Sequence, residues 1–167
     1  GAPEKLGSLH LADTMSFDAH KWLYQPIDCG LFLFRDLQLA RKTFAHTAEY
    51  TRTFSDDPVE AFAFFEESLE LSRKFRALKL WLSLRYFGID AFRDAIERSL
   101  ALAAHAHRTI EASETLELLA PPSLGVVCFR RRFPDADEAA HERLNAALVA
   151  ALEQRGIALV SSTRLHG

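Results

Sequence analysis

The stretch Ser16-Phe17-Asp18-Ala19-His20-Lys21-Trp22 places a carboxylate, an imidazole and an amine next to one another at the end of a predicted strand. Leu11 to Ala19 has the mixed polarity of a strand, and Cys29 to Phe34 is a short apolar run typical of a strand buried in a sheet. His20 to Asp28, between them, is predicted to be a turn. Because α/β sheets bind ligands at such strand ends, this stretch predicts a site as well as a fold class.

The three polar side chains of this stretch suggest a specific chemistry. If Asp18 to Lys21 is extended, Asp18 and His20 point to one side and Lys21 to the other, so a ligand lodged at the turn meets all three. A partly desolvated lysine amine loses its proton more readily and can then form a Schiff base with a carbonyl compound. A surface lysine beside a capping or core histidine is the alternative, and the tetrapeptide alone does not decide between the two.

Helices are predicted in the middle of the chain. Asp36 is expected to cap a helix that runs through about Thr43, and residues 45–57 have no apolar period, which indicates a long loop. Ser72 to Phe87 has apolar residues at helical spacing, and Gly88 stands where a left-handed residue would end that helix. A second helix is expected from Asp90 to about Ser113.

The last third of the chain predicts a small α+β layer. Its pattern alternates short apolar runs with one amphipathic stretch that Gly156 ends. The expected order is a strand at 116–119, a strand at 124–130, a helix at 138–155 and a strand at 157–161.

Composition and charge limit the class of partner. The chain has 167 residues, of which 49% are hydrophobic and 26% charged, as in an ordinary globular domain. The formal net charge of −3 argues against nucleic acid or an anionic membrane as a partner, and no apolar run approaches the length of a membrane helix. Cys29 and Cys128 do not form a disulfide framework, which indicates a reduced, cytoplasmic setting. A small-molecule partner is expected.

Other polar clusters predict no site. His105 and His107 are two apart in a helix and point away from each other, so they cannot share a metal, and no metal site is expected. The run 130–132 is interpreted as a solvated strand edge, and Glu66, Glu67 and Glu70 as a solvated acidic face. No Gly-rich phosphate loop, zinc spacing or serine nucleophile elbow occurs in the sequence.

A family resemblance covers nearly the whole chain, from about residue 11 to residue 165. The chain is similar to the pyridoxal-phosphate-dependent amino-acid decarboxylases of the aromatic-amino-acid decarboxylase group, also called group II. Four motifs carry the resemblance, in this order: Asp18-Ala19-His20-Lys21-Trp22-Leu23, Asp28-Cys29-Gly30, Phe75-Arg76-Ala77-Leu78-Lys79-Leu80-Trp81 and Gly125-Val126-Val127-Cys128-Phe129-Arg130.

The resemblance implies an α/β fold of the fold-type-I PLP-dependent transferase class. Residues 1–88 then correspond to the C-terminal part of the large domain, which binds pyridoxal phosphate (PLP), and residues 89–167 to a linking helix and the small α+β domain. The sole methionine is Met15 and only twenty residues precede Lys21, so the chain is expected to be a fragment. In the family, the carboxylate that holds the pyridine nitrogen lies upstream, and the chain alone is therefore expected to be inactive.

Site residues follow from the resemblance one by one. Lys21 is implied to hold PLP as an internal aldimine, with His20 and Asp18 as further cofactor-binding residues. Asp18 departs from the asparagine of some members, and Ala19 departs from a common proline, which leaves the segment less rigid. Tyr50 matches a catalytic tyrosine implicated in protonating the carbanion after carbon dioxide leaves. Ser72 matches a residue that shapes the substrate pocket, although a helix cap also accounts for it.

The implied activity is PLP-dependent decarboxylation of an L-amino acid by a homodimer, with the amino acid itself unspecified. A cysteine desulfurase-like or other fold-type-I PLP enzyme is one alternative, since those enzymes also place a histidine before the lysine. Gln25-Pro26-Ile27-Asp28-Cys29 lacks the Gly-Pro-x-Gly run that they tend to carry. A non-catalytic α+β interaction domain is the other alternative.

Overall fold

The computed structural model describes residues 3–45 and 63–163. The chain forms two compact units, Ala2–Arg93 and Asp94–Gly167, and each contains a two-stranded antiparallel sheet. The division falls within one helix, which also contains the boundary expected after residue 88. No helix in the described ranges is both long and apolar enough to cross a membrane.

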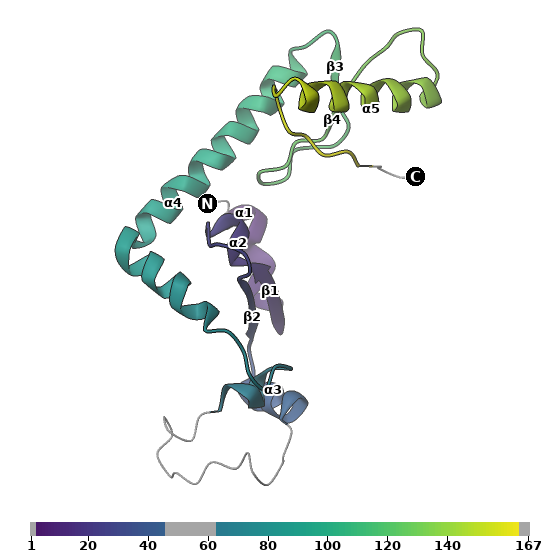
Figure 1. The fold of residues 1–167 in the computed structure, drawn as a ribbon. Coiled ribbons are helices and arrows are strands. Elements are labelled where there is room, and N and C mark those ends of the chain that lie inside the picture. Colours follow the sequence, from purple (N-terminus) through teal and green to yellow (C-terminus); the bar gives the residue numbers. More distant parts are fainter. Residues whose placement is uncertain (1–2, 46–62, 164–167) are drawn as a thin grey trace. The chain divides into compact units, whose positions relative to one another are not determined.

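The first unit is built around the pairing of β1 (Thr14–Asp18) with β2 (Gly30–Phe34) (Figure 1). Both predicted strands are therefore found, although β1 is shorter than expected at both ends, because Leu11 ends η1 and Ala19 begins α2. The other elements of this unit are α1 (Pro3–Leu6), η1 (Gly7–Leu11), α2 (Ala19–Trp22), α3 (Leu37–Phe44), η3 (Phe64–Glu67) and the first part of α4 (Arg76–Glu111).

The β2 strand is less buried than its apolar sequence predicts. Phe32 is 48% exposed and Leu33 is 46% exposed. In the described part of the chain β2 pairs with β1 alone, so the expectation of a fully buried strand is wrong for this structure. The small core instead includes Ala19 and Cys29, at the end of the sheet where β1 stops and β2 starts.

The α3 helix confirms the cap predicted at Asp36. The Asp36 carboxylate accepts hydrogen bonds from the backbone amides of Gln38 and Leu39, at 2.9 and 3.2 Å. These bonds satisfy two of the amides that a helix leaves unpaired at its start. The loop expected at residues 45–57 lies, after Ala45, outside the described residues.

The α4 helix contains one backbone break, at Gly88. This residue has φ 78° and ψ 159°, a conformation that is essentially restricted to glycine, so the predicted role of Gly88 as a helix interruption is confirmed. The helix begins at Arg76, later than expected. Ser72 therefore does not cap it.

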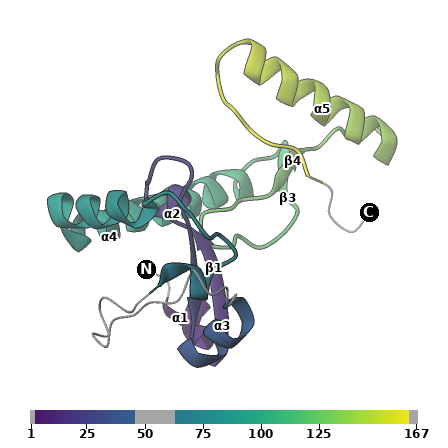
Figure 2. The ribbon, with the colours of Figure 1, turned by 60° about the horizontal axis from the view of Figure 1, so that its bottom comes forward.

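The second unit joins β3 (Leu116–Leu118), β4 (Phe129–Arg131) and α5 (Glu138–Gln154). The two strands lie side by side in Figures 1 and 2. The predicted helix is confirmed, with Asp137 as its cap and Gly156 at positive φ after its end. The predicted strand at 124–130 is mostly wrong, because a tight turn with Leu124 at φ 51° leaves only its end to pair. The segment 157–161 is not a strand.

Arg130 of β4 is paired with carboxylates, which corrects its interpretation as part of a solvated edge, whereas Arg131 is exposed. Arg130 binds the carboxylates of Glu117 on β3 and Glu138 on α5. The Asn145 side chain accepts a hydrogen bond from the Arg131 amide at 2.8 Å and donates one to the Arg131 carbonyl at 3.1 Å. The Asn145 side chain thus satisfies the backbone amide and carbonyl of Arg131, which a neighbouring strand would otherwise pair.

Replacement of Gly88 by alanine is expected to destabilise the chain. A Cβ atom at this φ and ψ costs about 1–3 kcal/mol, although no atom lies within 4 Å of the added carbon. Gly7→Ala is the matched control, because its added Cβ also meets nothing and Gly7 has no positive φ. Thermal unfolding should show a lower midpoint for Gly88→Ala only, and equal midpoints would contradict the assignment of strain.

Candidate active site

Lys21 lies on a helical turn, not on an extended segment. The α2 helix begins at Ala19, directly after β1, so Asp18 and Lys21 are three residues apart around one turn. The Lys21 Nζ atom therefore lies 3.0 Å from Asp18 Oδ2. The expectation that Lys21 points away from Asp18 is wrong, because side chains three apart in a helix are neighbours.

His20 joins this turn to the start of β2. Its Nδ1 atom accepts a hydrogen bond from the Cys29 amide at 3.1 Å, and its own amide donates to the Cys29 carbonyl at 3.3 Å. Because Nδ1 is an acceptor, the neutral imidazole carries its proton on Nε2. That atom lies 3.8 Å from Asp18 Oδ2, the same oxygen that Lys21 approaches.

The charges of the turn favour the ionised carboxylate. The hydrogen bond from Lys21 is the main cause that lowers the pKa of Asp18 below its ordinary value of 3.8, and the charges of Lys21 and His20 lower it further. The Lys21 side chain is 70% exposed. The partial desolvation expected for the amine is therefore not found in the described structure, and the amine is open to an incoming carbonyl compound.

The segment after Lys21 folds back onto α2. The Gln25 backbone amide donates to the Ala19 carbonyl at 3.1 Å, and the residue as a whole is 5% exposed. Its amide group donates to the Leu23 carbonyl at 2.7 Å, and Ser83 of α4 lies 3.1 Å from its oxygen. Gln25 is thus a buried polar group with both ends satisfied, which ties the turn to α4.

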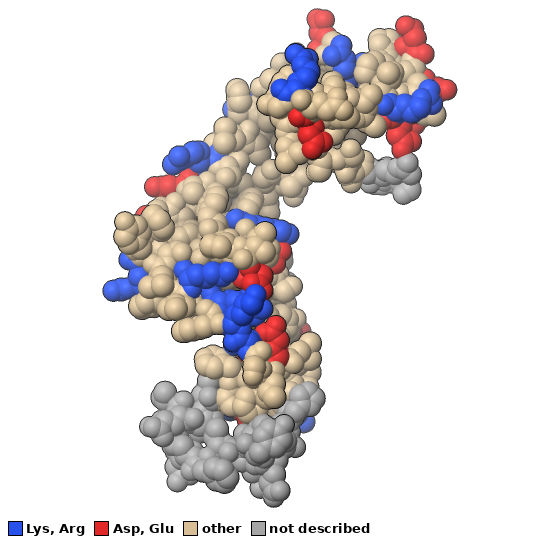
Figure 3. Space-filling view, viewed as in Figure 1, with Lys and Arg blue, Asp and Glu red and all other residues tan. Residues whose placement is uncertain are grey.

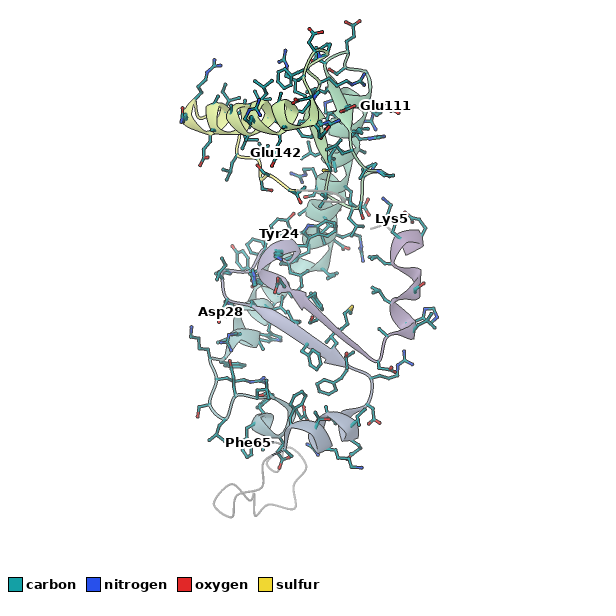
Figure 4. All side chains as sticks on the ribbon, turned by 90° about the vertical axis from the view of Figure 1, so that its right-hand side faces the viewer. Lys5, Tyr24, Asp28, Phe65, Glu111 and Glu142 are labelled. Carbon is teal, nitrogen blue, oxygen red and sulfur yellow. The ribbon has the colours of Figure 1, made fainter. Side chains whose placement is uncertain are left out.

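Arg76 and Lys79 of α4 bind residues 26–28, at the end of the turn, and the sequence did not predict either contact. Arg76 Nε donates to Asp28 Oδ2 at 2.9 Å, and this bond is the main cause that lowers the pKa of Asp28. Lys79 Nζ lies 2.7 Å from the carbonyl oxygens of Pro26 and of Asp28. Figure 4 labels Asp28 beside the start of β2. The motif from Phe75 to Trp81 contains both cations, but helical periodicity shows only its apolar stripe.

The acidic residues expected to be solvated are partly paired. Arg41 of α3 binds Glu67 at 3.1 Å and approaches Glu66 at 4.0 Å, while Glu70 accepts a bond from Arg76 at 3.1 Å. Figure 3 shows the same pattern of adjacent opposite charges on the face in view. Their interpretation as a purely solvated face is therefore wrong.

Two further residues that the resemblance singles out are not seen at this turn. Tyr50 lies outside the described residues, and Ser72 forms no hydrogen bond or ion pair with the described residues of the turn. His107 pairs with Glu111 at 3.7 Å. Within the described ranges, no group of histidine, cysteine, aspartate and glutamate side chains is arranged to hold a metal.

A cavity of about 210 Å³ lies beside the turn but does not include Lys21. Its walls combine α4 side chains with the residues that follow α2, and they are mainly apolar. The lining residues are Tyr24, Gln25, Ser83, Phe87, Ala91 and Phe92.

Comparison with known proteins identifies the family. Residues 2–132 match the sequence profile of the pyridoxal-dependent decarboxylase conserved domain. The chain belongs to this family. The family depends on PLP, and the lysine-bearing turn described above lies within the matched residues.

Relatives of this chain include decarboxylases that are named for aromatic amino acids. It is 38% identical to the aromatic-L-amino-acid decarboxylase of Bacillus atrophaeus over 96% of its own length and 34% of the relative's. It is 27% identical to tryptophan decarboxylase 2 of Oryza sativa subsp. japonica over 97% and 33% of the two lengths. The chain thus spans about a third of the length of the curated relatives it matches.

Solved structures confirm the expected α/β fold of the fold-type-I class. The crystal structure of Oryza sativa TDC with PLP and tryptamine matches with a TM-score of 0.87 and 27% identity, over 99% of this chain and 35% of that one. Catharanthus roseus tryptophan decarboxylase in complex with L-tryptophan matches with a TM-score of 0.80 and 27% identity, over 97% and 34%.

The pKa of Asp18 should report the contact with Lys21. Lys21→Met removes the hydrogen bond that stabilises the carboxylate, so the pKa of Asp18 should rise toward its ordinary value of 3.8. An NMR titration of the side-chain carboxyl carbon measures this shift. Lys42→Met, on α3, is the control and should leave Asp18 unchanged. An Asp18 pKa that is equal in all three proteins would contradict the contact.

Proposed function

We propose that the protein is a PLP-dependent amino-acid decarboxylase in which Lys21 binds the cofactor covalently. The observation that carries this proposal is the exposed Lys21 amine at the end of β1, 3.0 Å from the Asp18 carboxylate, which His20 also approaches. An aldehyde needs a reachable primary amine to form an imine, and the described residues fit that requirement. Family membership and the relatives' activities support the reaction class.

Asp18 and His20 have different proposed roles in binding the cofactor at Lys21. Asp18 holds the Lys21 amine at 3.0 Å, which limits the directions in which the amine can react. His20 offers a donor at Nε2, because its Nδ1 is occupied by the Cys29 amide. When bound, PLP supplies an acceptor for the electron pair that remains on the α-carbon after carbon dioxide leaves.

The substrate proposed is an aromatic L-amino acid. Support comes from the relatives, whose names include aromatic-L-amino-acid decarboxylase and tryptophan decarboxylase. Among the described residues, the walls of the cavity near Tyr24 and Phe87 are mainly apolar, as an aromatic side chain would require.

The assembly and setting of the protein are further parts of this proposal. We propose a homodimer, with residues 1–88 as the end of the PLP-binding domain and residues 89–167 as the linking helix and small domain. Exposed apolar side chains such as Phe32 and Trp81 support a buried interface. Cys29 and Cys128 are both free thiols, which supports a reducing, cytoplasmic setting.

Borohydride trapping tests the role of Lys21. Incubation of the full-length protein with PLP, followed by reduction and peptide mapping, should place the pyridoxyl group on Lys21. Lys21→Met should lose both the adduct and release of carbon dioxide from aromatic amino acids, while Lys42→Met keeps both. An adduct on Lys5, Lys42, Lys74 or Lys79 instead would overturn the assignment, and no adduct at all would favour an interaction domain.

Tyr50 is proposed as the residue that returns a proton to the α-carbon, on the strength of its sequence position alone. Tyr50→Phe removes that proton donor, and amine formation should fall about 10²- to 10⁴-fold, the usual contribution of a general acid. PLP absorbance should stay the same, because Lys21, the residue proposed to bind PLP, is unchanged. Amine formation at the unaltered rate would remove Tyr50 from the mechanism.

Sedimentation tests the proposed dimer. At micromolar concentration the protein should sediment at twice the mass of one chain, because apolar side chains that are exposed in one copy become buried against the other. A single species with the mass of one chain, unchanged on addition of PLP, would count against the dimer.

A further inference from the structure

Lys79 makes an unusual pair of contacts for a charged side chain. It lies on α4 one turn after Arg76, and its ammonium group is 2.7 Å from two backbone oxygens, those of Pro26 and Asp28. In the described part of the chain it forms no ion pair with a carboxylate. Its charge is therefore used to hold a stretch of backbone, and two carbonyl dipoles converge on it.

The backbone that Lys79 holds continues directly into the contact with His20. Cys29 follows Asp28, and both its amide and its carbonyl bond to His20. His20 in turn precedes Lys21. A short path of bonds thus runs from the Lys79 ammonium through residues 28 and 29 to the lysine of the proposed PLP site.

Arg76 holds a different part of the same residue. Its guanidinium binds the Asp28 side chain and Glu70, whereas Lys79 binds the Asp28 backbone. The Asp28 side chain is 48% exposed, so its ion pair with Arg76 is weakened by solvent. Lys79 is thus the cation of α4 that binds the backbone of residues 26 and 28, whereas Arg76 binds the Asp28 side chain.

We propose that Lys79 is a positioning residue for the Lys21 turn, which it fixes by binding the Pro26 and Asp28 carbonyls. The proposal rests on the proposed function in taking Lys21 as the cofactor lysine. Loss of the ammonium leaves the two carbonyls without their shared donor and loosens the segment. The Cys29 amide then no longer remains on His20 Nδ1, and the imidazole loses its preference for the Nε2 proton.

Three variants separate this role from a general loss of stability. Lys79→Met keeps much of the side-chain bulk but donates no hydrogen bond. Lys79→Arg keeps the charge and several donors, so it should restore much of the effect. Lys42→Met removes a lysine of α3 and is the matched control. If Lys79→Met does not fold, Lys79→Gln, which retains an uncharged donor, takes its place.

Two measurements on the protein without PLP report the turn directly. Exchange of the Cys29 amide with solvent should be at least about tenfold faster in Lys79→Met, as expected when hydrogen bonds to a charged group are lost. The ¹⁵N shifts of the His20 ring should move from a single Nε2–H form toward a mixture. Circular dichroism should show that the helices remain in every variant.

A third measurement uses PLP and borohydride. The rate at which Lys21 acquires the pyridoxyl group should fall about tenfold in Lys79→Met and stay near the unaltered rate in Lys79→Arg and Lys42→Met. Unchanged exchange of the Cys29 amide and unchanged His20 shifts in Lys79→Met would overturn the positioning role. Failure of the unaltered protein to label Lys21 would instead overturn the proposed function, since the NMR measurements do not need PLP.

Discussion

The hydrogen bond from the Cys29 amide to His20 Nδ1 is the contact on which the candidate site depends. It closes the segment between β1 and β2, because the amide at the start of one strand is paired with a side chain that follows the other. The same bond determines which nitrogen of His20 carries the proton. One bond therefore affects both the fold of this segment and the protonation of His20, while the orientation of Lys21 toward Asp18 follows from the helical turn of α2.

Local sequence signals account well for the parts of the fold that depend on neighbouring residues. Asp36 caps α3 through amides two and three residues ahead, and Gly88 takes a conformation that few other residues adopt. Both effects act over a few residues, so the sequence predicts them. The short α2 helix was missed, because Ala19 to Trp22 is too brief for a period to show.

Contacts between distant residues were beyond the sequence reasoning. Lys79 binds carbonyl groups about fifty positions earlier in the chain. Every residue has a backbone carbonyl, so no sequence pattern indicates which of them a lysine will bind. The ion pairs of Arg130 with Glu117 and Glu138 are a similar case. Many acidic and basic residues occur in the sequence, and only the folded structure shows which of them come into contact. The three residues of the Lys21 turn were found because they are adjacent in sequence, although their arrangement was not.

The break at Gly88 has a consequence for how the long helix unfolds. Helix order spreads because each new residue adds a hydrogen bond to a turn already formed, and a residue with non-helical φ and ψ interrupts that spread. The two stretches of α4 must each be nucleated and held by their own surroundings. The two stretches of α4 can therefore unfold independently of each other. Fraying that starts near Glu111 can stop at Gly88, before it reaches Lys79 and the Lys21 turn that Lys79 binds.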